Sequence, residues 1–196
     1  MTILQNKFFH DNTNIFYFSL FCDKIIYIVG ESEEIKMIYD KLAMNNGVIF
    51  ERTYDILNEK MCQGTINLEN RCEGADGMAA LDAALFVSVV VNCSFACELF
   101  LKSMLPQETR GHKLDELFSE LDDAIQENIK MRTIDEMKKG APEYCDTDFQ
   151  KDLTENSNKF AEWRYFHEGN AQTVNLKFIS QFMKSTFSVV NEERKK

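Results

Sequence analysis

The stretch Met78–Leu105, MAALDAALFVSVVVNCSFACELFLKSML, determines the architecture that we expect. It is apolar on nearly every face of a helix, and only Asp82, Glu98 and Lys102 interrupt it. A helix that is hydrophobic all round must be covered by its neighbours. The stretch therefore predicts the central helix of a bundle, which ends before Pro106.

Apolar residues recur at helical spacing on both sides of this stretch, separated by residues that start and end helices. Asn45-Asn46-Gly47 is predicted to end one helix, residues 64–77 to form a loop, and Thr147–Gln150 to form a capping box. The expected helices are 31–44, 48–61, 78–105, 113–138, 148–168 and 175–191.

Two runs rich in β-branched and aromatic residues, Ile15–Cys22 and Ile25–Val29, flank a polar pair and predict a short β-hairpin. The predicted fold class is therefore mainly α, a helical bundle with a small N-terminal β-hairpin. We expect residues 1–77 to pack on the bundle of residues 78–196 as one compact domain.

Composition narrows the classes of function. The net charge of −10 disfavours a protein that coats nucleic acid non-specifically, although a local positive pocket stays open. Six cysteines occur without a CxxC pair, and no motif for a metal, a nucleotide phosphate or a cofactor is present. The longest uncharged run, Ala83–Cys97, is short for a membrane span, and an export signal is lacking. We expect a cytoplasmic protein with no metal, no cofactor and no membrane partner.

The stretch Lys159–Asn170, KFAEWRYFHEGN, is the main candidate for function. On a helix, Arg164 shares a surface with His167 and Glu168, at spacings of three and four residues. These residues can form an ion pair at the edge of a core that Trp163 anchors. Alternatively, the arginine holds a phosphodiester and the histidine moves a proton.

Glu98 is the second candidate, because a carboxylate in so apolar a helix needs a partner. Lys102 lies one turn further along the helix, and Arg164 is a plausible second partner. His112 precedes a predicted helix and is either a capping residue or a second histidine of an active site.

Three stretches together resemble the HEPN family of α-helical domains, which occur in prokaryotic toxin, defence and RNA-processing proteins. They are Ala96–Leu105 (ACELFLKSML), Gly111–Phe118 (GHKLDELF) and Phe160–Glu168 (FAEWRYFHE). The resemblance covers about residues 78 to 191. It implies a helical bundle that often dimerises, so that an Arg-x(4–6)-His motif from each subunit meets in a shared cleft.

Active members of this family are metal-independent endoribonucleases that use the 2′-hydroxyl of RNA as the attacking group. The resemblance implies that Arg164 holds the phosphate, that His167 is the general acid or base, and that Glu98 orients the arginine. The substrate-binding residues would be Lys102, His112 and Glu168. His167 follows Arg164 after two residues, not four to six. Either it reaches the same cleft one turn early, or the protein is a non-catalytic member that binds a nucleotide or a partner protein.

We expect a homodimer, because an acidic bundle has little cationic surface and two protomers would pool their arginines in one groove. The helix that contains Trp163 and His167 is the predicted interface, since it has more aromatic residues than one helical face normally buries. The alternative is a monomer in which these aromatic residues cover the N-terminal hairpin.

Overall fold

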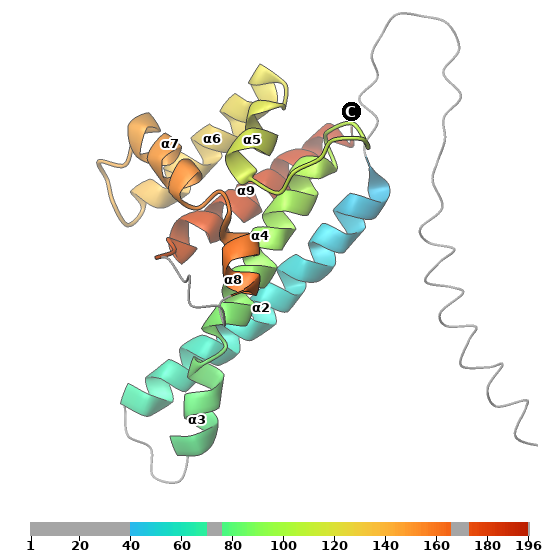
Figure 1. The fold of residues 1–196 in the computed structure, drawn as a ribbon. Coiled ribbons are helices and arrows are strands. Elements are labelled where there is room, and N and C mark those ends of the chain that lie inside the picture. The colour runs from blue at the N-terminus through green and yellow to red at the C-terminus, as the bar shows by residue number, and fades with distance from the viewer. Residues whose placement is uncertain (1–39, 70–75, 166–172, 196) are drawn as a thin grey trace, which may run out of the picture. The chain divides into compact units, whose positions relative to one another are not determined.

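The computed structural model describes residues 40–69, 76–165 and 173–195, and these belong to one compact unit, residues 37–196. All regular structure in these residues is helical (Figure 1), which confirms the mainly α class. The predicted hairpin and the first turns of the helix predicted at 31–44 lie outside the described residues. The helices are α2 (Lys41–Glu69), α3 (Asp76–Ala83), α4 (Phe86–Lys102), α5 (Leu114–Ser119), α6 (Asp123–Lys138), α7 (Asp146–Glu155), α8 (Lys159–Arg164) and α9 (Leu176–Glu193).

Helix α4 is the central helix of the bundle, and α2, α5, α8 and α9 all pack against it. Its inward residues are fully buried, as the apolar sequence predicted: Val89, Val90, Cys93, Ala96, Cys97, Phe100 and Leu101. The single helix expected at 78–105 is divided, however, because a turn at residues 84–85 separates α3 from α4. The helix also ends at Lys102, before Pro106, where the Ser103 hydroxyl donates to the carbonyl of Phe100 at 2.7 Å.

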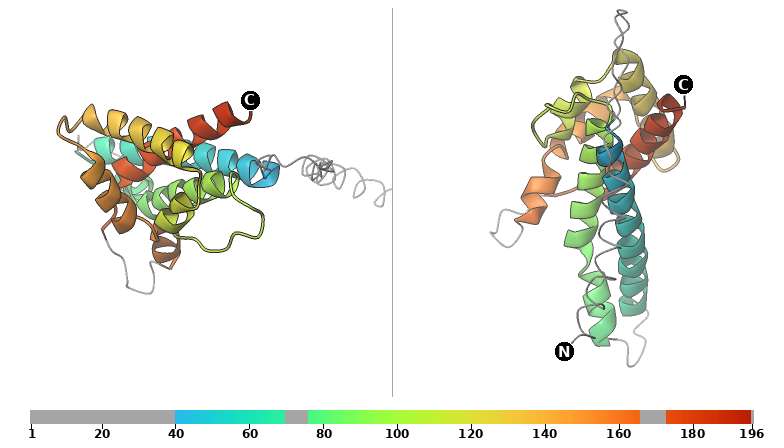
Figure 2. Two further views of the ribbon diagram at one scale, coloured as in Figure 1. Left: turned by 90° about the horizontal axis from the view of Figure 1, so that it is seen from above. Right: turned by 90° about the vertical axis from the view of Figure 1, so that its right-hand side faces the viewer.

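Helix α2 corrects the prediction of two helices and a loop between residues 31 and 77. It runs without a break from Lys41 to Glu69, and Figure 2 shows it lying alongside α4. A Cβ atom at Gly47 would lie 2.6 Å from the ring of Phe100, and one at Gly64 would lie 2.7 Å from the backbone nitrogen of Ala83. Both glycines therefore permit close packing of helices inside α2, and tertiary contact outweighs their tendency to end a helix.

The second half of the chain forms shorter helices than its periodicity predicted. The helix expected at 113–138 is divided into α5 and α6, and Asp122 caps α6 by accepting from the backbone of Ala124 at 2.9 Å. The helix expected at 148–168 is divided into α7 and α8, and its described part ends at Arg164. The capping box begins two residues early, because the backbone N–H of Cys145 donates to Asp148. Helix α9 agrees with the prediction of 175–191.

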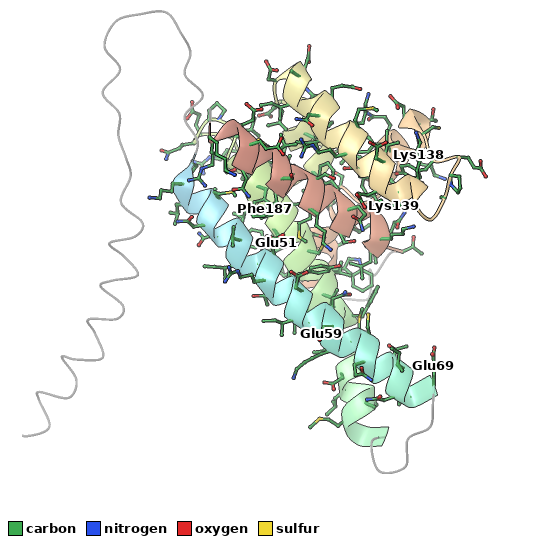
Figure 3. All side chains as sticks on the ribbon, turned by 180° about the vertical axis from the view of Figure 1, so that it is seen from behind. Glu51, Glu59, Glu69, Lys138, Lys139 and Phe187 are labelled. Atoms are coloured by element: carbon green, nitrogen blue, oxygen red, sulfur yellow. The ribbon has the colours of Figure 1, made fainter. Side chains whose placement is uncertain are left out.

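A cluster of phenylalanine rings joins α5, α7 and α9. Phe149, Phe178 and Phe182 are fully buried, and neighbouring ring centroids in the cluster lie 5.7 to 6.2 Å apart. On the other side of α9, Phe187 contacts Phe100 of α4 at 5.2 Å, and Figure 3 shows Phe187 where α9 passes α2. These contacts fix α5 against α7 and α9, and they thereby fix the end of the loop that precedes α5.

The apolar segment Gly77–Lys102 is, within the described residues, the one candidate membrane span by length and composition. Half of its most apolar window is buried inside the bundle. Burial raises the pKa of the Cys93 thiol well above its ordinary value, so this thiol behaves as the small buried hydrophobe that its position predicted.

Candidate functional site

Glu98 is a buried carboxylate of α4, with a side chain only 2% exposed. Its Oε1 atom accepts from the Lys102 ammonium at 2.9 Å and lies 2.9 Å from the His112 Nδ1 atom. The contact with Lys102 confirms the predicted pair one helical turn apart. We predicted Arg164 as the second partner of Glu98. In the structure the second partner is His112, from the loop before α5.

Two local features place the His112 ring against α4. Gly111 has a φ of 103°, in the left-handed region that glycine adopts without strain, and this conformation turns the chain immediately before the histidine. Two residues after the histidine, Leu114 begins α5 and donates its backbone N–H to the carbonyl of Ser157 at 3.0 Å.

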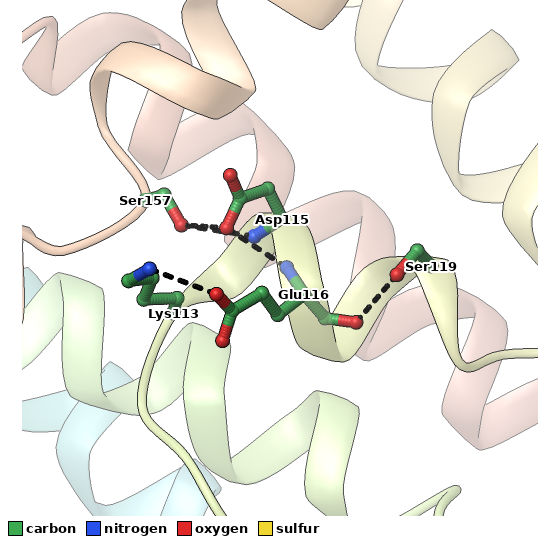
Figure 4. A network of polar contacts seen from close by, with 5 residues as sticks. All are labelled: Lys113, Asp115, Glu116, Ser119 and Ser157. Atoms are coloured by element: carbon green, nitrogen blue, oxygen red, sulfur yellow. Dashed lines mark hydrogen bonds and ion pairs between the residues drawn. The ribbon is translucent and has the colours of Figure 1, made fainter.

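The turn between α7 and α8 anchors the start of α5 (Figure 4). The Ser157 hydroxyl donates to the Asp115 carboxylate, and the backbone N–H of Asp115 donates to the Ser157 oxygen at 3.1 Å. On the outer side, Lys113 pairs with Glu116 at 2.8 Å. A segment 42 residues away in sequence therefore fixes the position of the loop that carries His112.

Phe160 of α8 connects His112 to Arg164. Its ring is stacked on that of Phe95 with centroids 4.4 Å apart, which fixes it on α4. The His112 ring lies 6.2 Å from the Phe160 centroid, and Arg164 Cζ lies 5.0 Å from the same centroid. The imidazole and the guanidinium are therefore no more than about 11 Å apart. We call this group, Glu98, Lys102, His112, Phe160 and Arg164, the α4–α8 corner.

The Arg164 guanidinium is exposed and packs on aromatic rings. Its Cζ lies 4.7 Å from the Tyr165 centroid, and its Nη2 donates to the Tyr165 hydroxyl at 3.0 Å. An arginine stacked on rings keeps most of its donors directed outward, where they can bind a planar or tetrahedral anion.

The α4–α8 corner is cationic in a protein that is otherwise acidic. Arg110 lies exposed in the same loop as His112, so the corner and this loop together contain two arginines, two lysines and a histidine, against the two carboxylates of Glu98 and Glu108. By contrast, Figure 3 shows Glu51, Glu59 and Glu69 spaced along α2. Burial, and then the charge of Asp55, raises the pKa of Glu51. The local positive site that the net charge left open stays a prediction, and the corner is where we expect it.

The structure brings together four of the predicted site residues: Glu98, Lys102, His112 and Arg164. The other two, His167 and Glu168, lie outside the described residues. Trp163 is 6% exposed and lies edge-on to Phe86 of α4, with centroids 5.2 Å apart, as expected of a core anchor.

Sequence reasoning missed Phe160 as the ring that His112 and Arg164 share, and Ser157 as the anchor of the loop. The one available signal was the need of Glu98 for a partner, which pointed to a nearby cation but not to His112. One of the two carboxylate oxygens of Glu98 has no hydrogen-bond partner among the described residues. Among the described residues, Glu98 Oε2 and the Ser94 hydroxyl, one turn earlier, are buried without a hydrogen bond.

A shallow groove of about 250 Å³ adjoins the corner. It lies between the start of α2, the end of α4 and the loop that follows, and Lys102 belongs both to this groove and to the corner. The described residues contain no group of three or more His, Cys, Asp or Glu side chains that could hold a metal ion. The corner itself offers an imidazole, a carboxylate and the cations of Lys102 and Arg164.

Comparisons with family models, with curated proteins and with solved structures gave no significant match.

Proposed function

We propose that the protein is an HEPN-like, RNA-directed protein that binds a phosphodiester at the α4–α8 corner. The observation that carries the proposal is the placement of His112 and Arg164 against one buried ring, with both side chains exposed to solvent. An imidazole, which can accept or release a proton, and a permanent cation are the groups that phosphodiester chemistry uses. Both lie within reach of one nucleotide.

The reaction that we propose is metal-independent cleavage of RNA in the cytoplasm, as part of a defence or toxin–antitoxin type system. Arg164 would hold the phosphate, because its guanidinium is stacked on rings and directs its donors outward. Lys102 would add positive charge beside it. His167, three residues after Arg164, is the general acid or base that the family resemblance implies, and Glu168 would contact the substrate.

A homodimer is part of this proposal, since a second copy would double the cations of the corner. Tyr165 is 46% exposed and is available for contact with a second copy, whereas Phe160 and Trp163 are buried against α4. Light scattering at tens of micromolar protein distinguishes the dimer from a monomer. A monomer that still cleaved RNA would show that one corner is sufficient.

The second candidate is a non-catalytic module that binds a partner protein. Leu42, Ile49 and Ile56 recur every seven residues along α2 and are 41%, 44% and 60% exposed. An apolar stripe at heptad spacing is suited to the apolar face of a partner helix. This candidate predicts binding of a helical partner without cleavage of RNA.

The first test is binding of a fluorescent single-stranded RNA at fixed salt concentration. Arg164→Ala should weaken binding about tenfold, which corresponds to about 1.4 kcal/mol. Arg52→Ala is the matched control, because Arg52 is an exposed arginine on α2, and it should change the Kd by less than about twofold. Equal Kd values for the three proteins would refute binding at the corner.

The second test is cleavage of the same RNA by the wild type, Arg164→Ala and His167→Ala. A substrate with 2′-deoxyribose at the cleaved position should resist the wild type, because the attacking hydroxyl is missing. Equal cleavage by all three proteins would mean a different site or a contaminating nuclease. Binding without cleavage would favour the non-catalytic reading.

A further inference from the structure

The contact between Glu98 and His112 has the geometry of a carboxylate that orients a general base. With Nδ1–H donating to the buried Oε1, the Nε2 atom keeps its lone pair and is the nitrogen available to substrate. The His112 side chain is 61% exposed, whereas Glu98 is 2% exposed. The carboxylate is therefore fixed inside the bundle, and the imidazole that it holds faces the solvent.

The charges around His112 are also arranged for proton transfer. Lys102 donates to the same oxygen as His112, so the carboxylate and the ammonium offset each other. If the imidazole accepts a proton, the positive charge that it gains lies next to the Glu98 carboxylate, whose Oε1 atom is 2.9 Å from Nδ1. Arg164, on the same Phe160 ring, can neutralise the charge that develops on a phosphate.

The loop that carries His112 is held from both sides, which a general base requires. Gly111 sets the turn before the histidine, and Ser157 fixes the backbone of Leu114 and Asp115 after it. A base held in place before the substrate arrives lowers the entropic part of the barrier. By contrast, a pair that served only stability would gain little from a ring that is mostly exposed.

We propose that His112 is the general base of RNA cleavage and that Glu98 is its positioning residue. The inference rests on the proposed function, and it assigns the base to the described corner and not to His167. His112 Nε2 takes the proton of the ribose 2′-hydroxyl, and the 2′-oxygen forms a bond to phosphorus. The P–O5′ bond breaks, and the leaving 5′-oxygen takes a proton from water. The products are a 2′,3′-cyclic phosphate and a 5′-hydroxyl end, and the hydroxide left by that water takes the proton from the imidazole.

The experiment compares four full-length proteins on a single-stranded RNA under single-turnover conditions, with the Kd measured in parallel. In His112→Ala the rate constant of cleavage should fall about 10²- to 10⁴-fold, as for loss of a general base, while the Kd changes less than about threefold. Glu98→Gln should lower the same rate constant by a smaller factor at unchanged Kd. Lys113→Gln is the control, because Lys113 is exposed, next to His112 in sequence and paired with Glu116.

Chemical rescue separates a catalytic role from a structural one. Added imidazole should restore cleavage by His112→Ala in proportion to its concentration, and it should not restore cleavage by Glu98→Gln, whose histidine is still present. A structural defect in His112→Ala would show a lowered midpoint of thermal unfolding and no rescue, and that result would overturn the proposal.

The remaining outcomes distinguish this inference from the function on which it rests. If the wild type and His112→Ala cleave equally, His112 is not the base, and the proposed ribonuclease stands with another base. If the wild type binds RNA but does not cleave it, the base is refuted and the binding function stands. If the wild type neither binds nor cleaves RNA, both proposals fall.

Discussion

Asp152 of α7 is a partly buried carboxylate and Glu98 of α4 a fully buried one, and their hydrogen-bond partners differ. Asp152 uses both oxygens: Oδ1 accepts from the Asn175 amide at 3.0 Å, and Oδ2 accepts from the Tyr144 hydroxyl at 2.8 Å. Asn156 completes this network by donating to the Asp152 carbonyl and accepting from the Asn175 backbone. The network joins α7 to the start of α9.

Glu98 uses one oxygen for two donors and leaves the other buried without a hydrogen bond among the described residues. A satisfied network stabilises a fold, whereas a buried acceptor without a donor destabilises it. The two carboxylates therefore have different roles. The Asp152 network is structural, and the arrangement at Glu98 is one that we expect to be retained for what it does to His112.

The largest effect on stability should come from Asp152→Ala. It leaves the Tyr144 hydroxyl and the Asn175 amide without their acceptor in a partly buried place, so the free energy of unfolding should fall by about 3 kcal/mol. Chemical denaturation measures it. Glu155→Ala, at an exposed position of the same helix, should change it by less than about 0.5 kcal/mol. A loss below about 1 kcal/mol for Asp152→Ala would remove the contrast with Glu98.

The next largest effect should come from Tyr144→Phe, at about 1.5 kcal/mol near neutral pH, because one hydrogen bond to a charged group is lost. Burial, and then the bond to Asp152, raises the pKa of Tyr144 above its ordinary value. The unfolded chain therefore releases this proton first, near pH 10, and the folded state loses stability as the pH rises further.

Tyr144→Phe should accordingly weaken the alkaline loss of stability without abolishing it. Burial raises the pKa of Tyr54 to about 12, so a second tyrosine contributes to the same loss in both proteins. Unfolding measured from pH 8 to 11 tests this expectation. Parallel pH curves for the wild type and the variant would show that the Asp152 network does not hold the Tyr144 proton.

A smaller effect is expected at Glu98. Glu98→Met replaces a carboxylate with one unsatisfied oxygen by an apolar side chain of similar length, and Lys102, 23% exposed, can turn to water. Removing one partner of a buried ion pair is costly when the other charge stays buried, but Lys102 and His112 can both contact water. The free energy of unfolding should therefore fall by less than about 1 kcal/mol. Thermal and chemical unfolding measure it. A loss near that of Asp152→Ala would make Glu98 a structural residue.

The smallest effect on stability should come from His112→Gln, since most of this side chain already contacts water. We expect a change below about 0.5 kcal/mol in the free energy of unfolding. Circular dichroism during denaturation gives the value. A loss above about 2 kcal/mol would mean that the imidazole supports the loop, and its contrast with the Asp152 network would disappear.

Sequence periodicity was sufficient to predict the helical class and the burial of α4, because a helix with apolar residues on every face must be covered by other helices. It was insufficient for helix boundaries. Gly47 lies inside α2 with the Phe100 ring packed against it, and that contact joins residues far apart in the chain. The division of α5 from α6 depends on Asp122, whose capping role was hidden within a run of acidic residues.

The residues of the candidate site were predicted from the sequence, but most of the contacts between them were not. The burial of Glu98 in an apolar helix correctly required a cation, and Lys102 followed from helical spacing. The partner His112 depends on a turn at Gly111 and on an anchor at Ser157, and no local pattern encodes a contact across 42 residues. His167 and Glu168 lie outside the described residues and stay predictions.

The anchor at Ser157 also has a consequence during synthesis of the chain. Glu98 and His112 leave the ribosome 14 residues apart, but Ser157 does not follow until 45 residues after His112. At about 5–20 residues per second, the nascent chain carries an unanchored histidine loop for about 2 to 9 s. Arg164 emerges later still. A growing chain therefore completes the α4–α8 corner only after Arg164 has emerged, 52 residues after His112.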